Sequence, residues 1–325
     1  MFLYEHTVYS LKKVVREDKM EHPPIHGSFV AIITPMTEDL KVDYDGFAKL
    51  LDFHLKEGTH GIVPCGTTGE SATMDHATHK EIIKFIVKYV KENGPKYGRT
   101  PGEDIVVMPG TGSNSTTEAI DLTKFAEKTG ADAVLLICPY YNKPTQEGLK
   151  LHFKMIADET SVPLVPYNIP SRTGRNMEAK TTIEIAKFEN VVGIKEASGN
   201  LAQMMEIIQK TDDNFAVMSG DDQLTLPLIA LGGKGVVSVA ANIVPKMMVE
   251  FTEALLNNNF QKGKELHYKL LDLFNIQFIE TNPGPIKYMA SLMGLPAGNL
   301  RPPMTLPQQR NEGKIKEVMK ALSLI

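Results

Sequence analysis

A lysine at the end of an apolar segment is the most informative residue of this 325-residue sequence. Lys195 follows Val191-Val192-Gly193-Ile194, a run typical of a strand in a protein interior. Burial disfavours the charged ammonium and lowers its pKa, so a lysine in this place could attack a ketone as a neutral amine and form a Schiff base. The alternative is a strand-end lysine that reaches solvent or pairs with a carboxylate. Polar residues at other strand ends favour the Schiff base.

Those polar residues follow several further apolar runs. If the runs are parallel strands of one α/β barrel, their C-terminal ends meet at one face, where the chemistry of such barrels takes place. We therefore expect one site built from the segments Gly66-Thr67-Thr68-Gly69-Glu70, Gly110-Thr111-Gly112-Ser113-Asn114, Tyr140-Tyr141-Asn142, Tyr167-Asn168, Arg172, Lys195-Glu196 and Gly220-Asp221-Asp222.

Two glycine-rich loops and two histidines suggest other chemistry, but only weakly. Neither Gly66–Gly69 nor Gly110–Gly112 continues into a nucleotide-binding pattern. The turn Gly66-Thr67-Thr68 suits a carboxylate better, since it offers backbone N–H groups and two hydroxyls. His76 and His79 could begin a zinc site, but no matching third ligand follows, so we expect surface histidines. Neither a metal nor an organic cofactor is expected.

The elements that must position these residues alternate between short β-branched runs and longer stretches with helical spacing. Most of the runs lack polar alternation, as in a parallel sheet covered on both faces. Eight βα units predict an α/β fold, the (β/α)8 TIM barrel, with an open doubly wound sheet as the alternative. The eight strand candidates are Phe29–Ile33, Gly61–Cys65, Ile105–Met108, Ala133–Cys138, Leu164–Tyr167, Val191–Lys195, Phe215–Ser219 and Gly235–Val239.

The pattern divides the chain into three parts. Residues 27–257 form the predicted barrel, which ends with a helix over Pro245–Asn257. Residues 258–325 have helical periodicity and predict a small C-terminal helical appendage. Residues 1–26 mix basic and acidic side chains without a continuous apolar stretch, unlike a signal or transit peptide. We expect them to form a surface extension or a short extra helix.

Composition excludes several classes of function. Hydrophobic residues make up 42% of the chain and charged residues 23%, as in ordinary globular enzymes. The net charge of −4 argues against nucleic acid or an anionic membrane as the main partner. No apolar run approaches the ~20 residues that span a bilayer. Cys65 and Cys138 form no CxxC motif and are predicted to be buried, reduced thiols, so a cytoplasmic location is expected.

Taken together, five segments resemble the dihydrodipicolinate synthase family, which belongs to the pyruvate-dependent class I aldolases together with N-acetylneuraminate lyase. The resemblance runs from about Gly27 to the C-terminus, and Gly284 departs from it because the family commonly has an aliphatic residue there. Its specificity comes from the order and spacing of the segments Ala31-Ile32-Ile33-Thr34-Pro35-Met36, Gly66-Thr67-Thr68-Gly69-Glu70-Ser71-Ala72-Thr73, Pro139-Tyr140-Tyr141-Asn142, Tyr167-Asn168-Ile169-Pro170-Ser171-Arg172-Thr173-Gly174 and Gly193-Ile194-Lys195-Glu196-Ala197.

The resemblance implies that pyruvate condenses with aspartate semialdehyde to 4-hydroxy-tetrahydrodipicolinate, the first step of the diaminopimelate–lysine pathway. Arg172 and Thr67 favour this reaction over the alternative, cleavage of a sialic or keto-deoxy sugar acid by another pyruvate lyase. A non-catalytic barrel that binds a small carboxylate is a further alternative, but Lys195 and Tyr167 are both present. The implied assembly is a homo-oligomer, a tetramer built as a dimer of dimers.

The resemblance also implies a role for each site residue. Lys195 forms the imine, and Tyr167 exchanges protons beside it through a relay with Thr67 and with Tyr141, which comes from a neighbouring subunit. The implied substrate-binding residues are Thr68 for the carboxylate of pyruvate, Arg172 for the carboxylate of the aldehyde, and Gly220 and Val237 for backbone contacts near pyruvate.

A second set of residues matches the lysine-binding positions of feedback-regulated members of the family. Their chemistry suits L-lysine, because a carboxylate can pair with its ammonium group and amide or phenol groups can bind its other end. The alternative is that these are ordinary polar residues on the surface. The set consists of Ala72, His76, His79, Gly112, Asn114, Glu118 and Tyr140.

Overall fold

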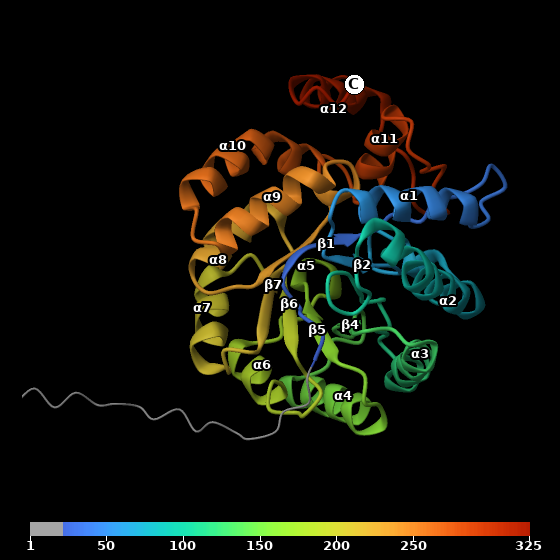
Figure 1. Cartoon of the computed structure of the whole chain (residues 1–325). Helices are drawn as coiled ribbons and strands as arrows, with labels where there is room; N and C mark the ends of the chain where they lie inside the picture. Colours follow the sequence, from blue (N-terminus) through green and yellow to red (C-terminus); the bar gives the residue numbers. More distant parts are fainter. Residues whose placement is uncertain (1–21) are drawn as a thin grey trace, which may run out of the picture.

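The computed structural model describes residues 22–325, so most of the predicted N-terminal extension, residues 1–26, lies outside the described residues. Within the described range, eight parallel strands form one curled sheet in the order β3-β2-β1-β8-β7-β6-β5-β4 (Figure 1). The strands are β1 (Gly27–Ala31), β2 (Gly61–Val63), β3 (Val106–Val107), β4 (Val134–Ile137), β5 (Leu164–Asn168), β6 (Gly193–Glu196), β7 (Ala216–Ser219) and β8 (Gly235–Ser238).

The sheet closes between its two outer strands. An isolated parallel bridge joins Gly110, which follows β3, to Leu135 of β4. The Thr111 N–H donates to Leu135 O at 2.9 Å, and the Leu135 N–H donates to Pro109 O at 2.9 Å. This seam completes the ring and confirms the predicted α/β barrel.

The strands are apolar on both faces, as predicted. One cluster fills the inside of the barrel and includes Phe29, Val165 and Met218. A larger cluster lies between the strands and the helices that surround them (Figure 1). Cys65 and Cys138 are buried free thiols, in agreement with the sequence-based prediction.

Helices follow the strands and begin at residues that favour helix starts. The side chains of Asp43, Asp75, Ser115, Thr145 and Asn200 each accept a hydrogen bond from a backbone N–H in the first turn. The helices around the barrel are α1 (Tyr44–Lys56), α2 (His76–Asn93), α3 (Thr116–Thr129), α4 (Gln146–Glu159), α5 (Pro170–Thr173), α6 (Ala179–Ile185), α7 (Leu201–Lys210), α8 (Thr225–Ala230) and α9 (Pro245–Leu256).

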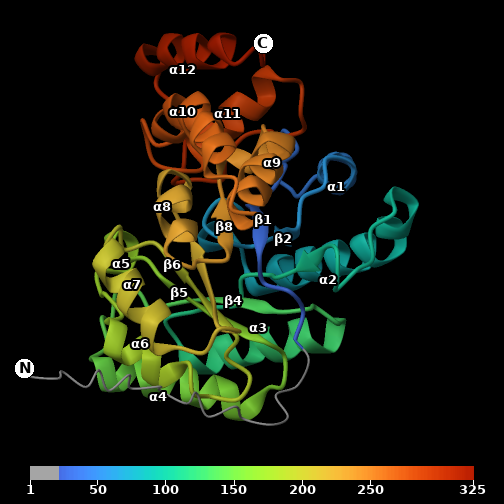
Figure 2. The same cartoon turned by 60° about the vertical axis from the view of Figure 1, so that its left-hand side comes forward.

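The C-terminal residues are helical, as the periodicity predicts. α10 (Phe260–Ile276) packs against α9, and α11 (Gly284–Leu292) and α12 (Gln309–Ala321) lie beyond it at one end of the barrel (Figure 2). A side chain at Gly284 would place its Cβ 2.6 Å from Thr305 O, so this close approach requires glycine. The division of the chain at residue 257 stays a prediction.

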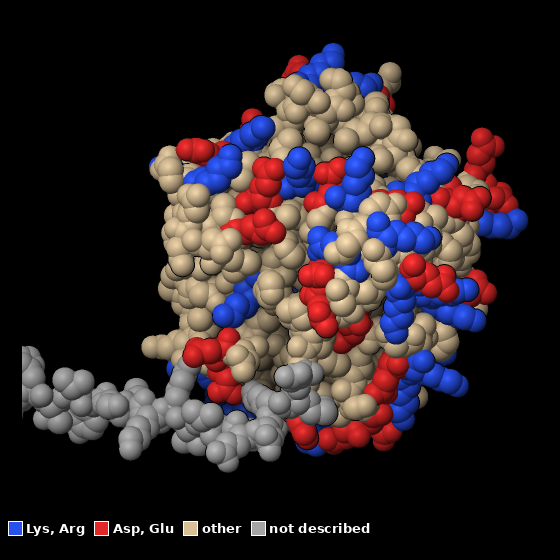
Figure 3. Space-filling view, in the orientation of Figure 1, with Lys and Arg blue, Asp and Glu red and all other residues tan. Residues whose placement is uncertain are grey.

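The surface mixes both signs of charge. Lysine and arginine side chains alternate with aspartate and glutamate over the face shown in Figure 3. Several neighbours form ion pairs, such as Lys80 with Asp121 and Lys124 with Glu159, at 2.6 Å each. Across residues 22–325, no helix combines the length and hydrophobicity that a membrane crossing needs.

Candidate active site

Lys195 lies inside the carboxyl end of the barrel. It belongs to β6 and stands opposite Tyr167 of β5 in the parallel register. Its side chain is only 6% exposed, and its Nζ lies 4.1 Å from the centre of the Tyr167 ring. Burial lowers the pKa of Lys195 to about 7, with Asp222 opposing the shift and Arg172 adding to it. The neutral amine that attacks a ketone is therefore well populated at neutral pH.

The pKa of Tyr167 is shifted in the opposite direction from that of Lys195. Burial raises the pKa of Tyr167 to about 12, against the effects of Arg172 and of a hydrogen bond with the Thr67 side chain. Its phenol therefore keeps its proton at neutral pH and can donate a hydrogen bond. Taking up a proton requires passing the phenolic one on, and Thr67 is the hydrogen-bonded neighbour able to receive it.

The threonine loop between β2 and α2 is tied to the C-terminal part of the chain. Thr68 is buried, and its Oγ1 accepts a hydrogen bond from Asn282 Nδ2 at 2.9 Å. Arg172, on α5, donates from Nη2 to Asn282 O at 3.3 Å. Asn282 thus links two predicted substrate-binding residues. Sequence reasoning assigned it no role, although an Asn-Pro pair is a pattern typical of turns.

The remaining predicted pyruvate contacts lie beside the lysine or inside the barrel. A Cβ at Gly220 would stand 3.1 Å from Lys195 Cε and 2.6 Å from the Ala197 side chain. Glycine at this position therefore lets the lysine side chain lie close to the backbone. Val237 of β8 is buried in the same interior cluster as Tyr167.

Tyr141 does not join Tyr167 within this chain. Its side chain is 90% exposed, and its backbone has φ +71°, in the left-handed region that non-glycine residues seldom adopt. The structure thus presents this tyrosine on the surface, after the end of β4.

The residues of the predicted lysine site lie near the starts of α2 and α3. Asn114 Nδ2 donates to Tyr140 O at 3.2 Å, and His76 Nε2 lies 3.8 Å from Glu118 Oε2. The remaining members of the set include Ala72, which lies on the exposed turn that follows the threonine loop, and Gly112, whose absent Cβ would lie 2.4 Å from Ile137 N.

The expectation that both histidines lie on the surface is wrong for His79. This side chain is buried, and its Nε2 lies 2.7 Å from Gly110 O. Burial lowers the pKa of His79, so it stays neutral where an exposed histidine would titrate. The apolar face of α2 packs inward and carries His79 with it, whereas His76 remains exposed. Among residues 22–325, no group of three His, Cys, Asp or Glu side chains is arranged to hold a metal ion.

A buried carboxylate lies behind the lysine, in the segment Lys195-Glu196 that we expected at the site, although sequence reasoning assigned it no role of its own. Glu196 is fully buried, and its Oε2 accepts hydrogen bonds from Asn168 Nδ2 and Gln203 Nε2, both at 3.0 Å. Its Oε1 accepts from the Ser198 N–H at 2.6 Å. These bonds fix the carboxyl ends of β5 and β6, and with them Tyr167 and Lys195. The position of Glu196 at the end of the strand predicted its presence at the site, but not this structural role.

A separate hollow of about 750 Å³ opens at the amino end of the barrel. His26, His60 and Lys234 line it together with residues that precede β6 and β7. Lys195 and Tyr167 are not among its lining residues. This hollow is therefore distinct from the candidate site.

Comparisons with known proteins agree with this geometry. A sequence model of the Dihydrodipicolinate synthetase family matches residues 24–322. The 4-hydroxy-tetrahydrodipicolinate synthase of Syntrophotalea carbinolica is 50% identical over 92% of this chain and 98% of its own length.

Two solved structures share the fold. The dihydrodipicolinate synthase of Acinetobacter baumannii, described as complexed with pyruvate, is 40% identical with a TM-score of 0.88, over 93% of this chain and 100% of its own. The enzyme of Cyanidioschyzon merolae, described with lysine bound, is 38% identical with a TM-score of 0.88, over 94% of this chain and 100% of its own. Sequence, fold and the surroundings of the buried lysine lead to one conclusion: the chain belongs to the dihydrodipicolinate synthetase family.

Proposed function

We propose that this chain is a lyase that condenses pyruvate with aspartate semialdehyde to 4-hydroxy-tetrahydrodipicolinate, the first step of the diaminopimelate–lysine pathway. The observation that carries the proposal is the buried Lys195 amine, whose pKa is about 7 and whose Nζ lies over the Tyr167 ring. Relatives of nearly equal length bear the name of this activity.

The reaction begins at Lys195. Its neutral amine attacks the ketone carbon of pyruvate, and loss of water leaves an imine. Once protonated, the imine withdraws electrons, so a methyl proton leaves and an enamine forms. The enamine carbon attacks the aldehyde carbon, which becomes a hydroxyl-bearing carbon. The amine of the second substrate then adds to the imine carbon, closes the ring and releases Lys195.

Each of these steps moves a proton near the imine. Tyr167 is placed to donate it, and its phenol must be reprotonated through a partner because its pKa lies far above neutrality. Thr67 is the first partner. Tyr141 is the second, supplied by a neighbouring copy of the chain, which agrees with its exposure on the surface of this one. The active unit is then at least a dimer, within a tetramer that works in the cytoplasm.

The substrate carboxylates have separate sites. Thr68 and the backbone of its loop bind the carboxylate of pyruvate, with Gly220 and Val237 lining the opposite side. Arg172 binds the carboxylate of the aldehyde, for which a planar guanidinium offers two parallel hydrogen bonds. Its effects on the pKa values of Lys195 and Tyr167 support a position near both.

L-lysine is the proposed inhibitor, at a site distinct from Lys195. Glu118 binds its side-chain ammonium, and Asn114 and Tyr140 bind its α-amino and carboxylate groups, with the rest of the set around them: Ala72, His76, His79 and Gly112. Tyr140 adjoins Tyr141, so bound lysine can disturb the proton relay through one short segment. A relative described with lysine bound supports this proposal.

Trapping with borohydride tests the central step. Wild-type protein treated with pyruvate and borohydride should gain one reduced pyruvyl group, which peptide mass spectrometry locates at Lys195. Lys195→Ala should gain none, whereas Lys234→Ala, a control lysine beside the amino-end hollow, should react normally. An adduct elsewhere, or none in the wild type, would refute the Schiff base. Turnover of other aldehydes in preference to aspartate semialdehyde would indicate a sugar-acid lyase instead.

A further inference from the structure

The threonine loop ends in an unusual backbone conformation. Glu70, two residues after Thr68, has φ +61° and ψ +30°, in the left-handed region. Residues other than glycine are disfavoured in this region because their Cβ crowds the backbone. They keep this conformation only where contacts with the surrounding structure stabilise it. The Glu70 N–H donates to Thr67 O at 3.1 Å, so the strained residue closes the turn that carries both threonines.

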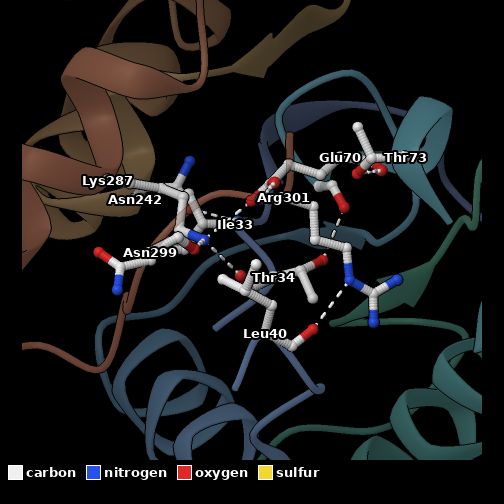
Figure 4. Close-up of polar contacts among 10 residues, drawn as sticks. Ile33, Thr34, Leu40, Glu70, Thr73, Asn242, Lys287, Asn299 and Arg301 are labelled. Atoms are coloured by element: carbon white, nitrogen blue, oxygen red, sulfur yellow. Dashed lines mark hydrogen bonds and ion pairs between the residues drawn. The ribbon is translucent and has the colours of Figure 1, made fainter. Parts of the chain in front are cut away.

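The side chain of Glu70 is held by a buried lysine from the C-terminal region. Lys287 of α11 and Glu70 both have fully buried side chains, and Lys287 Nζ lies 2.8 Å from Glu70 Oε1 (Figure 4). The ammonium donates its other two hydrogen bonds to Thr34 O at 3.0 Å and Asn299 O at 2.7 Å. All three of its donors are therefore used.

The other groups at the end of the loop are held as well. Glu70 Oε2 accepts from the Arg301 N–H at 3.0 Å (Figure 4). Thr34 Oγ1 donates to Gly69 O at 2.7 Å. Hydrogen bonds thus connect the turn to the residues that follow β1 and to the segment after α11. Because Lys287 bonds directly to the Glu70 side chain, movement of Lys287 would move the turn.

Stability alone does not explain this arrangement. Desolvation of two charges offsets much of their attraction, so a buried ion pair is often no more stabilising than apolar residues of similar volume. Such a pair does fix the relative position of its two side chains, since separating them would leave two buried, unpaired charges. Because the pair lies next to Thr67 and Thr68, it also fixes the position of these two threonines.

We propose that Glu70 and Lys287 are positioning residues for pyruvate: their ion pair sets the Thr67–Glu70 turn and so places the carboxylate-binding hydroxyl of Thr68. The inference rests on the proposed function, because it assumes that Thr68 contacts pyruvate. It gives α11, far from Lys195 in sequence, a part in substrate binding.

Three variants test the proposal: Glu70→Gln, Lys287→Met and the double variant. The measured quantities are the pyruvate concentration that gives half-maximal borohydride trapping at Lys195, and Tm. We expect half-saturation to rise about tenfold in all three, since small displacements of a binding group weaken binding strongly. The single variants should lose Tm through an unpaired buried charge, and the double variant should regain it. Tyr288→Phe removes a bond from α11 to Glu312 of α12 instead and should leave half-saturation unchanged.

Recovery of pyruvate half-saturation together with Tm in the double variant would overturn the proposal, because it would make the pair purely structural. An unchanged half-saturation in all folded variants would do the same. Should the charge variants fail to fold, Thr34→Val removes only the hydroxyl bond to Gly69 O and should still raise half-saturation about threefold; no change there rejects the inference. Absence of any adduct in wild-type protein would instead reject the proposed function.

Discussion

The two ends of the barrel both contain buried ionisable groups, yet only one is arranged for chemistry. At the carboxyl end, Lys195 and Tyr167 face each other with pKa values of about 7 and about 12. At the amino end, His60 lines a hollow of about 750 Å³, and burial merely lowers its pKa to about 4. Convergence of groups with oppositely shifted pKa values distinguishes the carboxyl end, where the candidate active site lies.

Backbone strain differs between the ends as well. Cys65, Glu70 and Tyr141, which follow β2 and β4 at the carboxyl end, adopt positive φ although none is glycine. At the amino end, the starts of β1 and β8 use Gly27 and Gly235 for positive φ, where no Cβ opposes it. Three strained residues therefore lie on the face where the substrates are proposed to bind, as functional strain often does, although Asn258, which follows Asn257 of the amino-end hollow, also has φ +60°.

The largest expected effect compares one lysine from each end. Lys195→Met should lower kcat by roughly 10³-fold or more, because it removes the proposed nucleophile. Its Tm at pH 8 should not fall: the folded pKa of Lys195 is about 7, below that of an unfolded lysine, so the native state loses a proton that the unfolded state keeps. Lys234→Met, at the amino end, should retain activity. Initial rates measure the activity of each variant, and thermal unfolding measures its Tm. Loss of activity in both variants would contradict the proposed difference between the two ends of the barrel.

Arg172→Ala should affect one substrate more than the other. Loss of a charged partner for the aldehyde carboxylate is expected to weaken its binding by ~2 kcal/mol, about thirtyfold in KM. Trapping of pyruvate at Lys195 should change little. Arg175→Ala, which removes a nearby guanidinium bound to Lys143 O, is the matched control. Equal losses for both substrates would contradict the assigned role.

Lysine inhibition should depend on Glu118. Calorimetry and initial rates at saturating pyruvate are expected to show inhibition by L-lysine that Glu118→Ala weakens about tenfold or more. Glu147→Ala removes an acid from the first turn of α4 instead of α3 and should leave inhibition intact. Unchanged rates at millimolar lysine would reject the site without affecting the catalytic assignment.

The pH dependence of imine formation should report the carboxyl end alone. Because only the neutral Lys195 amine reacts and its pKa is about 7, the trapping rate should rise about tenfold from pH 6 to pH 8 and then level off. His60 cannot produce this inflection, since its pKa of about 4 keeps it neutral throughout the range. A rate independent of pH would contradict the lowered pKa of the lysine.

The smallest effect concerns stability at the amino end. The pKa of His60 is about 4 when folded and near 6.5 when unfolded, so below pH 6.5 protons bind the unfolded state preferentially and stability falls until about pH 4. Between pH 7 and pH 5, the free energy of unfolding of His60→Gln should therefore fall by ~2 kcal/mol less than that of the wild type. Urea unfolding at the two pH values measures this difference. Activity at pH 7 should stay the same. An identical pH dependence in the variant would show that His60 does not contribute.

Local patterns predicted most of the barrel. Leu164–Tyr167 became β5 with one extra residue because an apolar run bounded by a polar end marks a buried parallel strand. The strand predicted over Ile105–Met108 is only two residues long in the structure, as β3, since few of its residues pair with β4. The pairing of β3 with β4 depends on closure of the whole barrel, so the local sequence does not predict it.

The candidate site was predicted as far as strand ends could reveal it. The pairing of Lys195 with Tyr167 follows from two polar ends on neighbouring strands. Asn282 and Lys287 were not found, because they meet Thr68 and Glu70 across separations of 214 and 217 residues. Their patterns look like an ordinary turn and an ordinary helix, and only the fold brings them to the loop. The roles of all these residues stay predictions.

The seam of the barrel has a consequence for local opening. Where the two ends of the barrel sequence meet, β1 and β8 pair over Gly27–Val30, whereas β3 and β4 are joined through the bridge of Gly110 with Leu135. A ring opens most easily at its sparsest join, so amide hydrogens of Thr111 and Leu135 should exchange with solvent sooner than those of β1. Asn114 follows this seam on one side and Tyr140 on the other. An effector that binds to both Asn114 and Tyr140 would stabilise the join between β3 and β4 and slow the exchange of these amide hydrogens.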